Sequence, residues 1–437
     1  MSPTLFHSVR LDQDKCVGCT TCIKKCPTEA IRVRKGRASI IDERCIDCGE
    51  CIRTCPHGAK KAISDPLSMI SGHRLKIAVP APALYGQFGE STGVDRILGG
   101  LLALGFDEVL EVAEAAEIVT EATRRLLAGG GGPRPLISSA CPAVVRLVQL
   151  RFPSLIPHLV PLLPPMEVAA RLAKERLHPG EEGVGVFFIT PCAGKVTAIR
   201  APLGYRESSL DGVIGIRDVY IQLRNALGAA PATAVSRAGP AGIGWGRVDG
   251  ESEAIGERRA ISVDGIGNVI GVLESLENGE LKNVEYIEAL ACPAGCVGGP
   301  LTVENPYIAK TRLRNREASA AARPPAPVRD HAPLEELGWT EVLRSRMALA
   351  LDPDMLKALV MMEELELIAE GLPGLDCGSC GAPTCRALAE DIVRGGAVAS
   401  DCIFKLRENV RKLARELIAL EERQPPGLDR EDRGAKA

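Results

Sequence analysis

The stretch VEYIEALACPAGCVGG (284–299) decides the fold of the central part of the chain. Its apolar first half is typical of a buried strand, which leads into a glycine-rich turn carrying Cys292 and Cys296. A second apolar stretch, GVGVFFITPC (183–192), also ends at a cysteine. We therefore expect buried strands whose carboxyl ends carry ligands.

The chain around these stretches alternates between the two kinds of secondary structure. LKIAVPAPAL (75–84) is typical of another buried strand, and residues 94–128 have helical periodicity broken at Gly105. This alternation predicts a mixed α/β layer architecture.

Four cysteines in this region are far apart in sequence but lie in similar contexts. The segments are SSACPAVV (138–145), TPCAGK (190–195) and the CPAGCVGG turn. Unrelated buried thiols are the alternative, since free cysteine is commonly buried. The repeated pairing of cysteine with proline argues against it. The four are Cys141, Cys192, Cys292 and Cys296.

The first eight cysteines follow C-x2-C-x2-C-x3-C-P twice, 29 residues apart. Three thiolates in a tight loop bind three corners of a cubane, and a distant cysteine supplies the fourth. A structural zinc site is the alternative, but it has no use for three consecutive ligands. We expect one [4Fe–4S] cluster on Cys16, Cys19, Cys22 and Cys55, and a second on Cys45, Cys48, Cys51 and Cys26. Between the two segments, IRVRKGRASII predicts two short strands around Lys35-Gly36.

The last cysteines are spaced C-x2-C-x4-C-x16-C, which predicts a third accessory [4Fe–4S] cluster, with zinc as the alternative. They are Cys377, Cys380, Cys385 and Cys402. The helix after them has an apolar seam at alternating three- and four-residue steps, formed by Ile403, Leu406, Val410, Leu413, Leu417 and Leu420. The seam either packs on its own domain or pairs with a partner helix, for instance in a homodimer.

The composition narrows the functional class. A net charge of -3 argues against nucleic-acid binding, and 3% aromatic residues leave no stacking platform. No apolar run is long enough for a membrane span, and no secretory signal is evident, so we expect a cytoplasmic protein. In that reducing compartment sixteen clustered cysteines point to metal and redox chemistry.

In order and spacing, SSACP, TPCAGK and CPAGCVGG resemble the three signature motifs of the [FeFe]-hydrogenase catalytic domain. The resemblance implies that the four scattered cysteines hold the cubane of a six-iron H-cluster. Cys296 would bridge it to a two-iron subsite with CO, CN⁻ and dithiolate ligands. It also implies that Lys195 donates to a cyanide, with a solvent-exposed ammonium as the alternative. Close approach to the cofactor is implied for Pro82, Ala83, Gly295, Gly298 and Gly299.

The chain departs from the family pattern at several positions. Ala140 stands where active members carry a proton-relaying cysteine, and Thr190 and Leu290 stand where methionines are common. The relay glutamates are not identified by the pattern, although Glu111, Glu114 and Glu117 lie in the right stretch. A methyl group cannot transfer a proton, and losing such assistance costs about 10²–10⁴-fold in rate, unless water or Thr190 substitutes.

The expected architecture is a multi-domain α/β protein that most resembles the sensory branch of the family. It comprises a ferredoxin-like α+β module (1–70), an H-cluster-type α/β domain (71–315), an Ala/Pro-rich linker (316–352), a helical four-Cys domain (353–423) and a disordered tail (424–437).

We expect a slow or sensory H₂-responsive redox protein of an anaerobe, acting on H₂ and protons. Its electrons would pass between the H-cluster and three accessory clusters, and to a redox partner such as ferredoxin. Because no signalling segment is evident, a sensory role would need a separate partner protein. An electron-transfer scaffold without the two-iron subsite, and a competent hydrogenase with a different proton path, are the alternatives.

Overall fold

The computed structural model describes residues 6–231, 235–323 and 334–423, and they form two compact units that do not follow the order of the sequence. The first unit contains the chain up to Val17, residues 25–30 and residues 40–349. The second contains residues 18–24, residues 31–39 and the chain from Ala350 onward. The expected disordered tail (424–437) lies outside the described residues.

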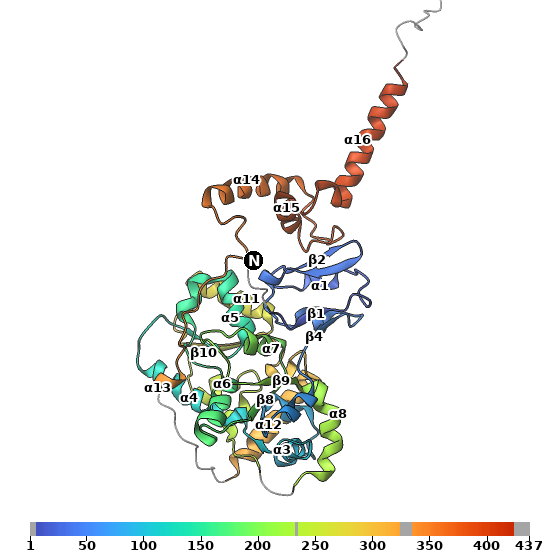
Figure 1. Ribbon diagram of the computed structural model, residues 1–437. Coiled ribbons are helices and arrows are strands. Elements are labelled where there is room, and N and C mark those ends of the chain that lie inside the picture. The colour runs from blue at the N-terminus through green and yellow to red at the C-terminus, as the bar shows by residue number, and fades with distance from the viewer. Residues whose placement is uncertain (1–5, 232–234, 324–333, 424–437) are drawn as a thin grey trace, which may run out of the picture. The chain divides into compact units, whose positions relative to one another are not determined.

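A four-stranded parallel sheet, ordered β6-β5-β8-β9, forms the centre of the first unit (Figure 1). Its two inner strands are almost entirely apolar, as expected for strands covered on both faces. The strands are β5 (Leu75–Pro80), β6 (Glu108–Val109), β8 (Val184–Thr190) and β9 (Gly212–Gly215). The mixed α/β prediction is confirmed.

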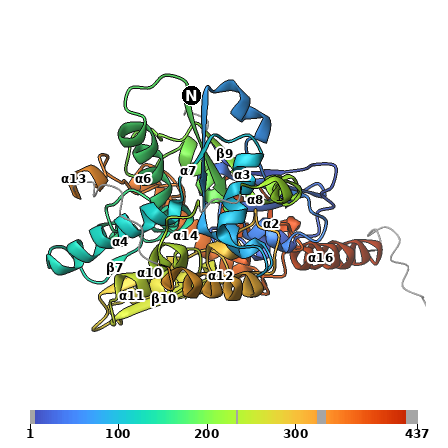
Figure 2. The same ribbon diagram turned by 90° about the horizontal axis from the view of Figure 1, so that it is seen from below.

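Helices α3 (Val94–Ala103), α8 (Ile216–Ala226) and α12 (Pro306–Ala321) share one hydrophobic core with this sheet (Figures 1 and 2). Asn305 caps α12 by accepting hydrogen bonds from the first-turn amides. Gly105, with φ +106°, ends the segment after α3 and separates it from α4 (Val112–Ala128). The predicted helical break at Gly105 is therefore confirmed.

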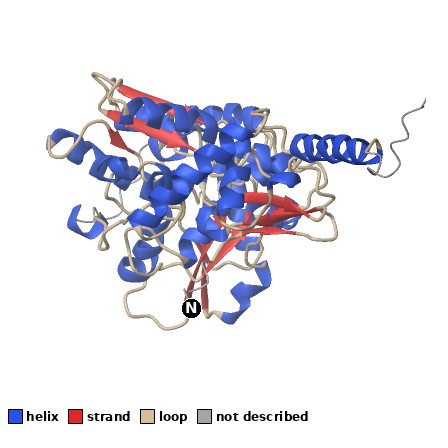
Figure 3. Cartoon of the chain, turned by 90° about the horizontal axis from the view of Figure 1, so that it is seen from above, coloured by secondary structure: helices blue, strands red, loops and turns tan. Residues whose placement is uncertain are grey.

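A second parallel sheet, ordered β10-β11-β7, has a separate core formed with α5 (Pro142–Arg151) and α11 (Ile266–Glu277). Its strands are β7 (Leu136–Ile137), β10 (Ala260–Asp264) and β11 (Tyr286–Leu290). In Figure 3 the strands, drawn in red, lie in separate groups with helices beside them. The remaining helices of this unit are α2 (Glu50–Thr54), α6 (Pro165–Arg171), α7 (Ala193–Arg200), α9 (Pro240–Gly244), α10 (Gly250–Ile255) and α13 (Leu334–Leu337).

The N-terminal cysteine-rich segment contains only short elements. Strands β1 (Val9–Leu11) and β4 (Lys60–Ala62) pair antiparallel. The hairpin predicted around Lys35-Gly36 is confirmed as β2 (Ile31–Arg34) and β3 (Arg37–Ile40), and both turn residues have positive φ.

The second unit joins this hairpin to the C-terminal helices. Asp391 accepts hydrogen bonds from Arg32 Nε at 2.8 Å and from Arg34 Nη2 at 2.7 Å, and the Val33 amide donates to the Gly381 carbonyl at 2.8 Å. Its helices are α1 (Thr21–Lys24), α14 (Met355–Gly371), α15 (Cys385–Val393) and α16 (Ile403–Glu421). A small apolar core lies between α14 and α15.

Helix α16 carries the predicted apolar seam and is drawn as one unbroken helix in Figure 1. None of its residues is buried, and the six seam side chains are 36% to 63% exposed. The alternative in which the seam packs on its own domain is therefore not what the structure shows. The segment expected as a linker (316–352) begins inside α12, and residues 324–333 lie outside the described ranges.

Across the described ranges no helix combines the length and the apolar character required to cross a lipid bilayer. All sixteen cysteines fall within these ranges, and each is a free thiol.

Candidate H-cluster site

The four scattered cysteines follow the strands of the two sheets. Cys141 precedes α5 just after β7, Cys192 precedes α7 just after β8, and Cys292 and Cys296 lie in the turn after β11. The parallel strands β7 and β11 have their carboxyl ends at one edge of the second sheet, which brings Cys141 near Cys292 and Cys296, whereas Cys192 comes from the end of β8 in the first sheet.

The electrostatics show that these thiols lie close to one another. Burial raises the pKa of Cys192, and the neighbouring Cys292, Cys141 and Cys296 raise it further. Burial likewise raises the pKa of Cys292 to about 11, although Arg53 acts in the opposite direction. Iron binds cysteine as thiolate, so a cluster at this buried site would have to displace the protons, and its positive charge would stabilise the thiolates that burial disfavours.

The turn that carries Cys296 is built from glycines because its backbone is packed against other backbone. Gly295 has φ +93°, and a Cβ at Gly295 would collide with the Arg247–Val248 segment. A Cβ at Gly298 would meet the Pro293 carbonyl, and one at Gly299 would meet the Pro191 carbonyl just before Cys192. The structure shows close contacts of these glycines with other protein segments, and their predicted close approach to the cofactor stays a prediction.

A pocket lies beside the four thiols, and Cys296 is the one of the four that lines it. Lys195 and Ala140 line the same pocket, together with Pro82 and Leu290. Ala83 is fully buried and is not one of the lining residues. Five of the residues that the resemblance places around a two-iron subsite therefore meet at one cavity, and Ala83 does not.

Lys195 extends from the first turn of α7 and is partly buried. Burial opposes its positive charge, but the thiolates of Cys296, Cys192 and Cys141 outweigh burial, so the pKa of Lys195 is raised. A fully charged ammonium in this pocket is suited to an anionic ligand. The alternative of a solvent-exposed ammonium does not describe this side chain.

Two glutamates that the sequence did not single out, Glu251 and Glu288, also line the pocket. Glu251 accepts hydrogen bonds from Ser138 Oγ at 2.8 Å and from Tyr286 OH at 2.5 Å. Burial and the neighbouring Glu288 raise the pKa of Glu251 to about 8. Glu251 therefore carries a proton at neutral pH.

Glu288 continues this polar network away from the pocket. Its Oε2 accepts hydrogen bonds from Ser252 Oγ at 2.9 Å and from Ser262 Oγ at 3.2 Å, and the two hydroxyls are 2.6 Å apart. Its Oε1 is buried without a hydrogen-bond partner among the described residues. Because Ser262 is partly exposed, the network extends from the pocket towards solvent.

The three glutamates in the stretch expected for the relay serve other contacts. Glu111 is buried and accepts from Tyr85 OH at 2.7 Å and from the Ala238 amide at 3.0 Å. Glu117 accepts from the Gly242 amide at 3.3 Å, and Glu114 pairs with Arg237 at 3.5 Å. None of the three lines the pocket beside Cys296.

Thr190 also has a local role. It ends β8 fully buried, and its Oγ1 accepts a hydrogen bond from the Cys192 amide at 3.2 Å. The hydroxyl thus shapes the turn that presents Cys192, and Thr190 is not one of the residues lining the pocket.

The second ferredoxin-type set also comes together within the first unit. Burial is the main cause that raises the pKa of Cys45 and of Cys48. The neighbouring Cys48 and Cys26 raise the pKa of Cys45 further, and Cys26 and Cys51 raise that of Cys48. His7 and Asp47, which the sequence did not single out, lie beside Cys45 and are joined by a 2.7 Å hydrogen bond.

The other two predicted sets are placed less completely. Cys16 and Cys55 belong to the first unit and Cys19 and Cys22 to the second, so their shared cluster stays a prediction. The C-terminal set, Cys377, Cys380, Cys385 and Cys402, lies wholly in the second unit. There the positive φ of Gly378 and Gly381 allows the loop to wind tightly around the sulfurs.

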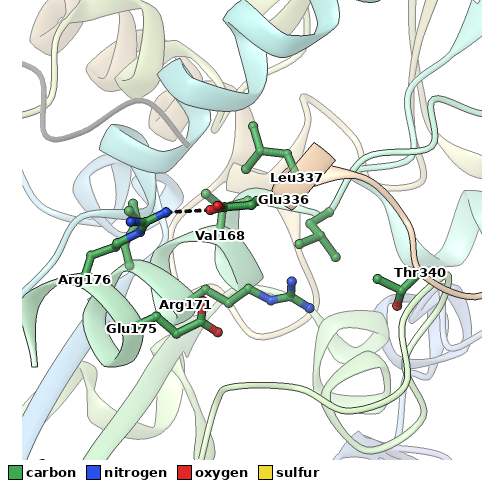
Figure 4. A pocket seen from close by; sticks show the side chains of 9 residues that line it. Val168, Arg171, Glu175, Arg176, Glu336, Leu337 and Thr340 are labelled. Carbon is green, nitrogen blue, oxygen red and sulfur yellow. Dashed lines mark hydrogen bonds and ion pairs between the residues drawn. The ribbon is translucent and has the colours of Figure 1, made fainter. Parts of the chain in front are cut away.

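A second pocket of the first unit, shown in Figure 4, is lined by side chains of α6, of the π-helical segment Leu172–Leu177 that follows it and of α13, together with Leu163 and Thr340. Arg176 donates to Glu336 at 2.7 Å, and Arg171 lies 3.7 Å from Glu167. The two arginines that line this pocket are therefore each paired with a glutamate, and none of the predicted site residues lines it.

The residues around the first pocket fit an iron–sulfur centre. They comprise four free thiols close together, a charged lysine and a buried carboxylate with one unpartnered oxygen. Cys141, Cys192, Cys292 and Cys296 would hold the cubane, and the pocket beside Cys296 would take the two-iron subsite.

Comparisons with known proteins agree with this site. Residues 75–235 and 244–300 match the family described as "Iron only hydrogenase large subunit, C-terminal domain". Residues 8–56 match the "4Fe-4S dicluster domain" family, and residues 372–404 match an Fe–S cluster family.

Two proteins with similar sequences carry iron hydrogenase names. The periplasmic [Fe] hydrogenase large subunit of Nitratidesulfovibrio vulgaris is 30% identical over 251 residues, which are 51% of this chain and 59% of that protein. Iron hydrogenase 1 of Clostridium pasteurianum is 26% identical over 229 residues, 48% of this chain and 38% of that protein. The chain thus matches less than two thirds of either relative.

Solved structures of [FeFe]-hydrogenases also match. A variant of HydA1 from Chlamydomonas reinhardtii gives a TM-score of 0.45 at 17% identity, covering 60% of this chain and 86% of that one. On the three family matches, together with the sixteen free cysteines and the pocket beside Cys296, the chain belongs to the iron-only hydrogenase large-subunit family and is an iron–sulfur protein with ferredoxin-type clusters.

Proposed function

We propose that this protein is a slow, H₂-responsive [FeFe]-hydrogenase-like enzyme that passes electrons between an H-cluster and three accessory [4Fe–4S] clusters. The observation that carries the proposal is the meeting of Cys296, Lys195 and Ala140 at one pocket beside three further thiols. When bound, the two-iron subsite supplies the metal chemistry that splits and forms H₂, while the protein supplies ligands, orientation and proton transfer.

Each residue of the pocket has a distinct role in this proposal. Cys296 would hold the subsite next to the cubane, because it is the thiol that lines the pocket. Lys195 would donate a charge-assisted hydrogen bond to a cyanide ligand and so would orient the subsite. Pro82 and Leu290 limit the access of water.

Protons travel by a route different from the one the family pattern predicts. Ala140 presents a methyl group to the pocket, so no proton is exchanged there. The protonated Glu251 and the adjacent Glu288 replace it, and Ser252 and Ser262 connect them to solvent. The loss of a positioned thiol at residue 140 removes general acid–base assistance at that point of the pocket, which is why we propose a low turnover.

A low turnover suits detection of H₂ better than its bulk consumption. The redox change would be passed to a ferredoxin-type protein in the cytoplasm of an anaerobe, and from there to a separate signalling partner. The proposal of a sensor rests on the methyl group of Ala140, because an enzyme selected for flux would keep its relay.

The seam on α16 is proposed to pair with a second copy of the chain. In a seven-residue repeat labelled a to g, the a positions are Ile403, Val410 and Leu417, and the d positions are Leu406, Leu413 and Leu420. Mostly β-branched residues at the a positions with leucine at the d positions favour a parallel two-stranded coiled coil, in which the two helices pack through identical seams.

The experiment that tests the function is an H₂ assay on protein matured with a complete H-cluster under anaerobic conditions. The proposal predicts measurable but slow H₂ oxidation and evolution. Rapid turnover would instead identify a competent hydrogenase with an efficient proton path. The absence of both reactions in protein with intact accessory clusters would identify an electron-transfer scaffold.

A further inference from the structure

Arg53 occupies an unusual position between two cysteine sets of the first unit. It belongs to α2, between Cys51 and Cys55 of the ferredoxin-type segment, and its side chain is 20% exposed. Its Nη1 donates to the sulfur of Cys292, one of the four thiols beside the pocket, at 3.6 Å. Its Nη2 donates to the carbonyl of Cys48 at 3.4 Å.

The guanidinium acts electrostatically on both sets. Burial works against its charge, but Cys292, Glu50 and Cys48 favour that charge, and together they raise the pKa of Arg53. In return Arg53 opposes the burial effect on the pKa of both Cys292 and Cys48. One cation therefore stabilises thiolate charge in two ligand sets.

The segment that carries Arg53 is held firmly against the central domain. A Cβ at Gly49 would lie 2.6 Å from the Pro300 side chain, just beyond the turn that carries Cys296. A Cβ at Gly194, two residues after Cys192, would lie 3.4 Å from the Asp47 carbonyl. In addition, Ser8 donates to the Ala193 carbonyl at 2.7 Å. These contacts leave Arg53 little freedom to move away from Cys292.

Glu50 sets how much of this positive charge the cysteines experience. Its Oε2 accepts from Arg53 Nη2 at 2.8 Å and from Arg53 Nε at 3.2 Å, so the carboxylate lies on the side of the guanidinium away from Nη1. The pair is thus a dipole with its positive end towards the Cys292 sulfur.

We infer that Arg53 is a positioning residue that raises the reduction potential of the cubane held by Cys141, Cys192, Cys292 and Cys296. Transfer of one electron from the cluster on Cys26, Cys45, Cys48 and Cys51 makes the cubane more negative by one charge, with no bond formed and no proton moved. A cation and an N–H donor at a ligand sulfur stabilise that added charge. The inference rests on the proposed function only in that a cubane occupies these four thiols.

The test uses the whole chain produced without H-cluster maturation, so that cubanes form and the two-iron subsite does not. Redox titration at fixed pH is followed by electron paramagnetic resonance, and the signal of this cubane is the one that Cys141→Ser removes. Arg53→Met should lower the midpoint potential of this cubane by at least about 59 mV. For one electron this shift corresponds to a tenfold change in the equilibrium constant. Glu50→Gln should raise the midpoint potential, since only the counter-charge is lost.

Opposite shifts from two adjacent substitutions cannot come from general damage to the fold. Arg53→Lys keeps the charge but loses the planar fork and should fall between Arg53→Met and the unaltered chain. Arg74→Met, at a surface ion pair with Glu181, is the matched control and should leave the midpoint unchanged. If Arg53→Met fails to fold, the Arg53→Lys and Glu50→Gln variants still decide the sign.

Unchanged midpoints in all three variants, or shifts of the same sign for Arg53→Met and Glu50→Gln, would overturn the inference. If Cys141→Ser removes no signal, no cubane occupies the four thiols, and that result rejects the proposed function together with the role of Arg53. A cubane signal that is present but insensitive to Arg53 rejects this inference alone.

Discussion

Ser138 Oγ donates a hydrogen bond to the buried carboxylate of Glu251 at 2.8 Å, only two residues before Ala140. The segment that lacks a proton-relaying side chain is thus attached directly to an acid that lines the same pocket. Tyr286 OH, on β11, donates to the same carboxylate. The two hydrogen bonds together fix the position of Glu251. The loss of one proton carrier and the presence of another are features of the same site.

Replacing Ala140 with cysteine should raise turnover. A thiol at this position lines the pocket and can exchange a proton, and general acid–base assistance contributes about 10²–10⁴-fold. The rate of H₂ evolution by matured protein is the measurement. Ala140→Ser is the control for side-chain size and should give a smaller gain. An unchanged rate in Ala140→Cys would mean that proton delivery at this position does not limit the reaction.

Glu251 should impose a pH dependence on the reaction. Burial and the neighbouring Glu288 raise its pKa to about 8, so it holds a proton below pH 8 and loses it above. H₂ evolution should therefore fall as the pH rises through about 8. Glu251→Gln should remove this inflection and lower the rate by roughly 10²-fold or more.

The matched control is Glu253→Gln, on the same helix but 56% exposed and paired with Arg247. It should keep both the rate and the inflection. A Glu251→Gln variant that retains the inflection near pH 8 would place the titrating group elsewhere.

Glu111 should matter for stability and not for proton transfer. It is 1% exposed and accepts hydrogen bonds from Tyr85 OH, Ser236 Oγ and the amides of Arg237 and Ala238. Glu111→Ala leaves several buried donors unsatisfied, at about 1–3 kcal/mol each. Urea unfolding of the anaerobic protein should show a clearly lower midpoint, while the pH profile of the folded fraction stays unchanged. A Glu111→Ala variant with unchanged stability but lost activity would show that Glu111 takes part in proton transfer.

Leu413→Asp should convert a dimer into a monomer. Leu413 lies in the middle of the seam on α16, is 59% exposed and would face its counterpart in a parallel pair. Sedimentation equilibrium of the whole chain gives the mass directly. Arg415→Asp, two residues along and outside the seam, is the control and should stay dimeric. If the unaltered chain is monomeric, the proposed dimer is wrong, and the seam on α16 would have to bind a different protein.

The cysteine sets could be predicted from the sequence because their spacing is local or their short contexts are distinctive. Cys292 and Cys296 follow a strand by way of a glycine turn, and the structure has β11 and this turn where the pattern placed them. Lys195 was predicted from the resemblance of TPCAGK to the second signature motif of the family. The mixed α/β architecture followed from the apolar inner strands β5 and β8.

The second acid–base group could not be predicted in the same way. Glu251 lies on α10, more than 100 residues from Ala140 in sequence, and the fold alone brings the two to one pocket. Glu288 did leave a signal, because an acid in the middle of the apolar stretch VEYIEAL is costly to bury without a purpose. The contact of Arg53 with Cys292 left none, since it joins two parts of the chain 239 residues apart.

The central claim is that the pocket beside Cys296 holds a two-iron subsite with CO and CN⁻ ligands. Infrared spectroscopy of anaerobically matured protein tests it most directly, with Cys296→Ser as the comparison. Bands of bound CO and CN⁻ in the unaltered protein, lost in Cys296→Ser while the accessory clusters remain, are the predicted result. A spectrum without these bands from protein that carries its full set of [4Fe–4S] clusters would contradict the account.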